Sequence, residues 1–233
     1  MEKQKKLGKL FLPSLTLVLL VLAIGFYLPT LVTEQLTKAI SVNLYSSGNL
    51  VVKHSTSPAF LLFSGRINNL SVEGTNLETH HINVSKILLQ VDKLRVSMWD
   101  LLAYGRLNVV DSQGRAALTI SEAELDKYLH RFYIDDQYHT IKLELKDDGP
   151  RISGTYNSRD FYLDCVFTVE QNSILALSPK KMVSTNPDTQ SIMGKLAQMS
   201  SYSIELETLG IPLVIDELSV KDNYLYVFAS VSN

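Results

Sequence analysis

The chain has 233 residues, of which 45% are hydrophobic and 20% are charged, a composition that supports a folded core and excludes bulk disorder. Its single cysteine, Cys165, excludes an intrachain disulfide and a zinc site built from cysteines. The formal net charge is −2, but the first nine residues carry +3, so the remaining residues carry −5. Because such a domain lacks the cationic surplus needed to neutralise phosphates along a duplex, we expect no nucleic-acid partner.

A long uncharged segment follows the basic N-terminus. Leu10 to Thr33 comprises 24 residues without a charged side chain, enough for a helix to cross a hydrocarbon core of ~30 Å. Lysines precede this segment and Glu34 follows it, which favours a cytoplasmic N-terminus. We therefore predict a single-pass protein of the cell membrane, with a basic cytoplasmic tail over residues 1–9, a transmembrane anchor over residues 10–33 and an extracytoplasmic domain over residues 34–233.

Two alternatives to this anchor stay open. The small residues from Ala23 to Gly25 also suit a cleaved signal peptide, which gives the same topology. Apolar character that continues from Phe26 to Val32 favours the uncleaved anchor. A buried core helix is the second alternative, and the lack of a polar face disfavours it.

The remaining residues contain no linker and indicate one β-rich domain. Apolar and polar residues alternate most clearly over residues 141–146 and 161–169, which predicts strands with one buried face. The turn sequences Asp147 to Pro150 and Lys221 to Asn223 predict two antiparallel hairpins. Further strands are expected over residues 50–53, 66–72, 87–96, 107–111, 116–120, 151–156, 213–220 and 224–231.

Three helices are expected besides these strands. Ser121 and Glu124 match a capping box ahead of an apolar stripe formed by Leu125, Tyr128 and Leu129. Residues 186–187, Asn-Pro, supply a cap and a first-turn proline for an amphipathic helix that contains Ile192 and Leu196. A third helix would continue the membrane segment outward over residues 31–44, with three residues toward the sheet, Leu36, Ala39 and Ile40.

None of the common catalytic signatures G-x-S-x-G, H-E-x-x-H and G-x-x-x-x-G-K-[ST] occurs in the chain. His80 and His81 are adjacent, so on a strand they would point to opposite faces and would not share a metal ion. The pairs Asp135-Asp136 and Asp147-Asp148 fit solvated turns better than paired catalytic carboxylates. Cys165 is expected to be a small buried hydrophobe with a raised pKa. We therefore expect neither an enzyme nor a cofactor.

Two apolar segments outside the predicted anchor are candidates for contact with lipid. Residues 58–63, PAFLLF, form either a lipid-entrance loop or a short core segment. Residues 98–102, MWDLL, offer either an interfacial tryptophan or a helical turn that closes the domain.

Four stretches of the chain, taken in order, resemble the bacterial LmeA-like phospholipid-binding family. They are PAFLLFSGRINNLSVEG from residue 58, LLQVDKLRVSMWDLL from residue 88, ALTISEAELDKYL from residue 117 and LGIPLVIDELSVKDNYLYVFASV from residue 209. The resemblance implies an envelope protein that binds phospholipid, with a mainly β, α+β fold in which a strongly curved antiparallel sheet wraps around one or two helices. It carries no invariant catalytic residue onto this sequence.

The anchor, the strand-rich domain and the resemblance together predict a membrane-tethered, extracytoplasmic protein that sequesters phospholipid in an apolar groove or hands it over. Such a groove would shield acyl chains from water, which is worth about 0.8 kcal/mol per CH₂. A structural protein that docks another envelope protein without lipid is the alternative, and a hydrolase without a recognisable nucleophile is the third. The candidate groove or entrance residues are Phe60, Leu61, Phe63, Met98, Trp99, Phe161, Leu163, Phe167, Ile192 and Leu196.

Overall fold

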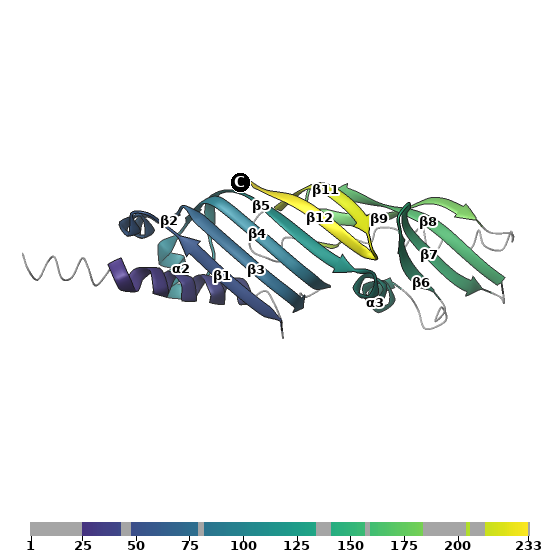
Figure 1. Cartoon of the computed structure of the whole chain (residues 1–233), viewed down its shortest axis with the longest axis horizontal. Helices are drawn as coiled ribbons and strands as arrows, with labels where there is room; N and C mark the ends of the chain where they lie inside the picture. The colour runs from purple at the N-terminus through teal and green to yellow at the C-terminus, as the bar shows by residue number, and fades with distance from the viewer. Residues whose placement is uncertain are drawn as a thin grey trace, which may run out of the picture.

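The computed structural model describes residues 25–42, 48–78, 82–133, 141–156, 159–183, 204–205 and 213–232. Within these residues the strands form two antiparallel sheets, one of seven strands and one of five. The molecule is elongated, and the two sheets follow one another along its long axis (Figure 1). The helix α3 (Glu122–Tyr133) lies where the larger sheet gives way to the smaller one. The predicted mainly β, α+β class is confirmed.

The seven-stranded sheet combines segments from both ends of the chain. The C-terminal hairpin pairs with a strand that precedes it by about a hundred residues in the sequence. In this pairing Tyr224 lies opposite Ser121. The strand order is β1 (Asn49–Ser55), β3 (Asn69–Glu78), β4 (Asn83–Val96), β5 (Val109–Ser121), β12 (Tyr224–Ser232) and β11 (Leu213–Lys221), with β2 (Arg66–Ile67) paired to β4.

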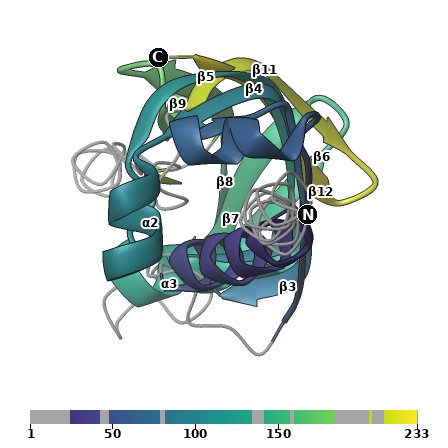
Figure 2. The same ribbon diagram turned by 90° about the vertical axis from the view of Figure 1, so that its left-hand side faces the viewer.

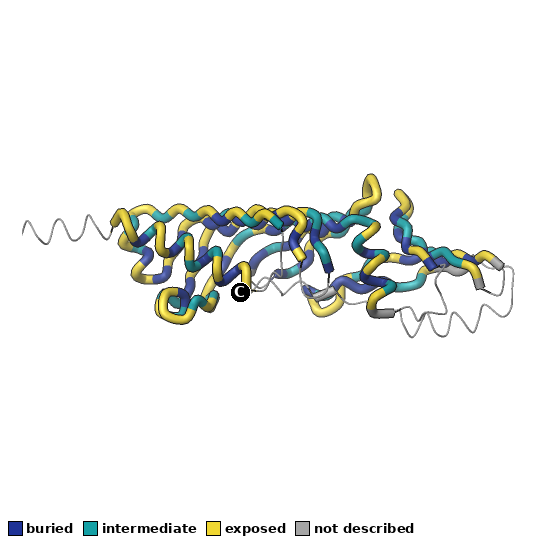
Figure 3. Tube along the Cα trace, turned by 90° about the horizontal axis from the view of Figure 1, so that it is seen from below, coloured by how far each residue is buried: buried dark blue, intermediate teal, exposed yellow. Residues whose placement is uncertain are grey.

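The five-stranded sheet follows the order β10 (Ile204–Glu205), β9 (Ile174–Val183), β8 (Arg159–Glu170), β7 (Gly149–Tyr156) and β6 (Lys142–Lys146). Buried and exposed residues alternate along its strands as predicted, and Figure 3 shows the same alternation over much of the molecule. Both predicted hairpins, β6–β7 and β11–β12, are confirmed. The backbone amide of Ile215 donates to the Asn172 carbonyl oxygen at 2.7 Å and so connects the two sheets.

A helix over residues 25–41 lies on the inner side of the curved seven-stranded sheet (Figure 2). Its buried residues recur every three to four positions, as expected for one apolar helix face. His54 on β1 adds a hydrogen bond of 2.9 Å between its Nε2 atom and the Pro29 carbonyl oxygen. The predicted orientation toward the sheet is confirmed, and the buried residues are Leu28, Val32, Leu36, Ala39 and Ile40.

This helix changes the predicted boundary between anchor and domain. Leu28 and Val32 belong to the segment assigned to the membrane, yet they are 8% and 0% exposed because they pack in the core of the domain. The domain therefore begins at residue 28 or earlier and not at residue 34. Residues 10–24 lie outside the described part of the chain. Among the described residues, the helices are too short or too polar to span a bilayer.

Several strand predictions differ from the structure, and one of them, over residues 66–72, is divided between β2 and β3. Residues 107–111 and 116–120 were expected as separate strands, but β5 runs continuously through Gly114. A Cβ atom on Gly114 would collide with the Gln90 carbonyl oxygen, so the glycine marks a close approach of β4 and not a turn. Strand β9 lies outside the predicted strands. It contains Pro179, which lies opposite Cys165, where the β8–β9 register shifts.

The resemblance implied one curved sheet, and the described residues form two. Period-two patterns identify strands without indicating which strands pair. The predicted helix over residues 186–199, the pair His80-His81 and the pair Asp135-Asp136 lie outside the described residues.

Candidate functional site

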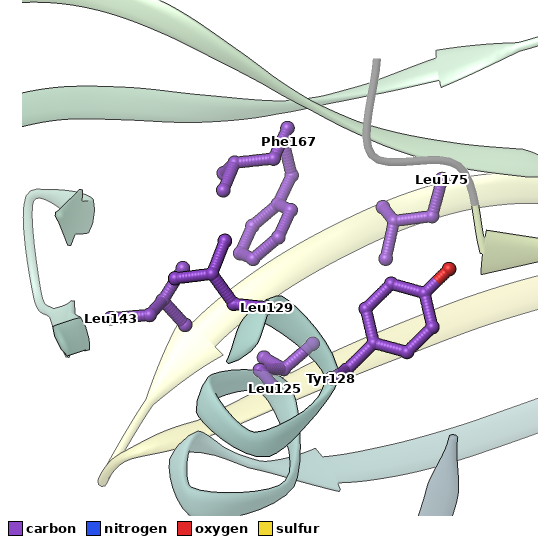
Figure 4. A pocket seen from close by; sticks show the side chains of 7 residues that line it. Leu125, Tyr128, Leu129, Leu143, Phe167 and Leu175 are labelled. Atoms are coloured by element: carbon purple, nitrogen blue, oxygen red, sulfur yellow. The ribbon is translucent and has the colours of Figure 1, made fainter. Parts of the chain in front are cut away.

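An apolar pocket lies where α3 packs against the five-stranded sheet (Figure 4). Its volume is about 20 Å³, which exceeds the ~10–15 Å³ that one water needs but is far too small for an acyl chain. The pocket is therefore an apolar space that larger ligands can use only if its walls separate. Those walls are Leu125, Tyr128 and Leu129 from α3, Leu143 from β6, Phe167 from β8, and Leu175 and Leu177 from β9.

The N-terminus of α3 is fixed as the sequence predicts. The backbone amide of Glu124 donates to the Ser121 Oγ atom at 3.3 Å, which is the hydroxyl half of a capping box. The Glu124 carboxylate pairs with the Nζ atom of the exposed Lys127 at 2.6 Å, so it faces away from the Ser121 amide instead of closing the box. The cap therefore sets where α3 begins and which side carries Leu125, Tyr128 and Leu129 toward the pocket.

Two carboxylates of α3 bind the edge of the five-stranded sheet. Leu143 donates its backbone amide to Asp126 Oδ1 at 2.8 Å, and Leu145 donates to Glu122 Oε2 at 2.7 Å. Glu122 and Asp126 are four residues apart on the helix, a rise of about 6 Å, and Leu143 and Leu145 are two residues apart on the strand, about 7 Å. The spacing of the two carboxylates therefore matches the spacing of the two amides that β6 points outward. This pairing protects an edge strand and holds α3 over the pocket. Sequence reasoning missed it, although the i, i+4 spacing of Glu122 and Asp126 was visible.

Cys165 is buried in the five-stranded sheet. Its Sγ atom lies 3.5 Å from the Leu163 carbonyl oxygen, toward which the thiol donates a weak hydrogen bond. Burial raises the pKa of this thiol to about 12. The predicted raised pKa is confirmed, and Cys165 is protonated at neutral pH.

We expect Cys165 to react slowly with thiolate-specific reagents in the folded protein. At pH 9 an ordinary thiol is about half ionised, whereas a thiol with a pKa near 12 is ionised to roughly one part in a thousand. Because the folded state keeps this proton and the unfolded state loses it, stability also falls as the pH rises from about 9 toward 12. Timed labelling with a chromogenic disulfide at pH 9, before and after urea unfolding, should show a rate difference of roughly a thousandfold. Equal rates would refute the assignment, and Cys165→Val should reduce the alkaline loss of stability.

The acidic pair Asp147-Asp148 forms the turn between β6 and β7, as predicted. The Asp148 side chain is 77% exposed and lies 4.0 Å from the Arg151 guanidinium. Arg151 donates to Asp164 at 2.8 Å, which raises the pKa of Arg151, and also lies over the Tyr162 ring. Within the described ranges, the side chains of His, Cys, Asp and Glu do not gather into a group of three that could hold a metal ion.

The structure separates the candidate residues into three groups. Phe167 lines the pocket, whereas Phe161 and Leu163 are buried in the core beside it. Ile192 and Leu196 lie outside the described residues. The remaining candidates lie at one end of the molecule, away from the pocket, in the 3₁₀ helix η1 (Ala59–Ser64) and in α2 (Met98–Tyr104): Phe60, Leu61, Phe63, Met98 and Trp99.

At that end, each segment is partly buried and partly exposed, so the core alternative is confirmed and the lipid-contact alternative stays a prediction. Leu62 and Leu101 are buried, so η1 and α2 each contribute to the core. Phe60, Phe63 and Trp99 are 66%, 60% and 72% exposed. The segments therefore close the domain with one face and present aromatic rings to the surroundings with the other.

The sequence profile of the LmeA-like phospholipid-binding family matches residues 25–228. The chain belongs to this family. The match begins where the described helix begins and includes both sheets, so the whole described fold lies within the family, apart from the last residues of β12. Membership supports lipid binding in general, in agreement with a pocket lined by hydrophobic side chains. Searches of curated proteins and of solved structures find no match to the chain.

Proposed function

We propose that this protein is a membrane-tethered, extracytoplasmic phospholipid-binding protein of the bacterial envelope, which sequesters lipid or hands it over. Family membership over most of the chain is the observation that carries the proposal. The apolar pocket between α3 and the five-stranded sheet would supply a place for acyl chains once its walls separate. The uncharged sequence before residue 28 supplies the tether, which would keep the domain at high effective concentration beside the membrane.

Lipid binding at this site requires α3 to move away from β8 and β9. The helix contributes three apolar walls, and its polar attachment to β6 consists of the two hydrogen bonds from Leu143 and Leu145. An acyl chain that fills the widened space gains about 0.8 kcal/mol for each CH₂ removed from water, so several methylenes offset the lost contacts of α3. The small closed pocket is therefore the lipid-free form in this proposal.

A phospholipid with a photoactivatable diazirine near the end of one acyl chain tests the proposal. We expect the full-length protein in vesicles to form adducts on α3, β8 and β9 after illumination, at peptides that contain Leu129, Phe167 or Leu175. Leu177→Trp should fill the pocket and reduce these adducts at least severalfold, because the larger ring occupies the space of the chain. Peptide mass spectrometry of the digested protein locates the adducts.

The control variant is Val166→Trp, on the same strand as Phe167 but 40% exposed on the other face of the sheet. This substitution should leave the adducts unchanged. Adducts confined to residues before 28, in both the wild type and the variants, would show that the lipid contacts only the tether and would contradict an interior site.

A further inference from the structure

The end of the molecule where the N-terminal helix begins is rich in exposed aromatic side chains. Figure 2 views this end directly and shows η1, α2 and the first turns of the helix around it. Each of these three elements presents large apolar residues to solvent. They are Phe26, Tyr27 and Leu31 from the helix, Phe60 and Phe63 from η1, and Trp99, Leu102 and Tyr104 from α2.

Local backbone geometry fixes this cluster. Gly65 ends η1 with a φ of 74°, and a Cβ atom there would collide with the Val96 carbonyl oxygen. Gly105 ends α2 in the same left-handed conformation, with a φ of 63°. Each glycine donates its backbone amide to the preceding turn, at Leu62 and Leu101 respectively. The two aromatic segments are therefore held in place by caps and do not depend on a bound partner for their shape.

A cationic cleft adjoins the exposed aromatic residues. It has a volume of about 340 Å³, within the usual range for small-ligand sites. Its polar lining consists of three cations, one amide and one carboxylate: Arg66, Lys93, Arg95, Asn68 and Asp111. The balance of charge in the cleft is thus positive, although the chain after residue 9 carries a net −5.

The cations of the cleft outnumber the one carboxylate beside them, Asp111, which is the cross-strand neighbour of Arg95 on β5. Arg66 and Arg95 are direct cross-strand partners, an arrangement that costs stability because like charges lie opposite one another. In the described part of the chain, no carboxylate lies within 4.0 Å of Arg66, Lys93 or Arg95. The ion pairs found there involve Lys127, His130, Lys146 and Arg151 instead. An anion bound between the guanidinium groups would remove the repulsion.

The cationic residues of the cleft are close in sequence to the exposed aromatic residues of both η1 and α2. Phe63 precedes Arg66 by three residues, and Trp99 follows Arg95 by four. Asp100 follows Trp99 in α2, and its carboxylate accepts a hydrogen bond from the Asn108 side-chain amide at 3.0 Å. The hydrogen bonds with Ser97 and then Asn108 lower the pKa of Asp100. Cations beside exposed aromatic rings are the combination that recognises the headgroup region of an anionic bilayer.

We propose that this end of the domain docks on the surface of an anionic phospholipid membrane, with lipid phosphates in the cleft of Arg66, Lys93 and Arg95 and with Phe60, Phe63 and Trp99 in the interface. The position agrees with this occupant, because the uncharged N-terminal sequence leads into the helix at the same end. The inference rests on the proposed function for the presence of the membrane, and it assigns the surface through which lipid would reach the domain.

Trp99 is the single tryptophan of the chain, so its fluorescence reports on this surface alone. The full-length protein is reconstituted in phosphatidylcholine vesicles with or without phosphatidylglycerol, using lipids brominated on their chains as quenchers. With phosphatidylglycerol we expect blue-shifted emission, strong quenching by bromolipid and protection from aqueous iodide. High salt should reverse these changes, because the contribution of the cations is electrostatic.

The decisive variant is Arg66→Gln/Arg95→Gln. Each cation removed should lower the equilibrium constant for docking by a little more than fivefold, so the double variant should dock roughly thirtyfold more weakly. The matched control is Lys86→Gln/Arg115→Gln, which removes two exposed cations elsewhere on β4 and β5 and should leave Trp99 docked. Phe60→Ser/Phe63→Ser should also weaken quenching, and circular dichroism confirms that each variant is folded.

Iodide-accessible Trp99 in every vesicle composition would overturn the proposal, as would equal effects of the two cation variants. Capture of another envelope protein that is lost in Phe60→Ser/Phe63→Ser, with Trp99 still exposed on vesicles, would assign the surface to a protein partner instead. Interior photoadducts measured on the same vesicles distinguish these outcomes from a failure of the proposed function, because adducts on α3 and β8 do not require Trp99 to dock.

Discussion

Replacing Leu36 with alanine is expected to lower the free energy of unfolding by about 2–5 kcal/mol. Leu36 is fully buried where the N-terminal helix packs on the curved sheet, so the substitution removes three carbon atoms, the Cγ methine and both Cδ methyl groups, and leaves a cavity. Urea denaturation of the full-length protein in mild detergent, followed by far-ultraviolet circular dichroism of the sheets, measures the loss. A large effect would establish that the helix after the tether belongs to the domain core.

Leu31→Ala is the matched control, because the same side chain on the same helix is 48% exposed there. Its effect should stay near 0.5 kcal/mol or below, as for most surface substitutions. If the two substitutions had equal small effects, the helix would not be packed on the sheet in solution. Residues 28–33 would then be free to extend the membrane segment, and the boundary at residue 34 would be restored.

The sequence predicted most of the local structure correctly because each element has a local cause. Strands β6 and β8 follow from period-two alternation, and α3 follows from Ser121 and the apolar stripe behind it. The pairing of β12 with β5 could not be predicted, because this contact depends on segments separated by about a hundred residues. Pro179 shows the remaining limit: a proline usually ends a strand, but here it lies at a register shift inside one.

The candidate site was harder to predict than the fold. Phe161, Leu163 and Phe167 follow the same alternation, yet two are core residues and one lines the pocket. Alternation gives the face of a strand and contains no information about whether an opposing side chain fills the space. The cationic cleft was missed for a related reason, since Arg66 and Arg95 become neighbours only through the pairing of β2 with β4.

The two proposed lipid contacts lie apart along one elongated fold, the surface at one end and the pocket between the two sheets. The aromatic and cationic surface lies where the N-terminal helix begins, whereas the pocket lies beyond the larger sheet at α3. Lipid that arrives at the membrane end would have to follow the inner side of the curved sheet to reach the pocket. The N-terminal helix occupies that side, so under the proposed function the packing of Leu36 and the attachment of α3 would control access.

Removing both carboxylates that hold α3 to β6 is the second substitution with a large expected effect. Glu122→Ala/Asp126→Ala leaves the backbone amides of Leu145 and Leu143 without their acceptors. Hydrogen bonds to charged acceptors contribute about 1.5–3 kcal/mol each, and water can replace part of this at the sheet edge, so we expect a loss of about 2–4 kcal/mol for the pair. Hydrogen exchange at the β6 peptide should accelerate more than exchange in β8.

Comparing the alanine pair with two further variants shows whether the lost hydrogen bonds cause the loss of stability. Glu122→Gln/Asp126→Asn keeps an oxygen acceptor at each position and should retain most of the protection of β6. Glu124→Ala removes only the exposed pair with Lys127 and should cost no more than about 1 kcal/mol. If the alanine pair accelerates exchange in β6 and also raises photoadduct formation in the pocket, attachment of α3 limits lipid access. Faster exchange with unchanged adducts would confine the two carboxylates to protecting the edge strand, and unchanged exchange would show that neither hydrogen bond holds the helix.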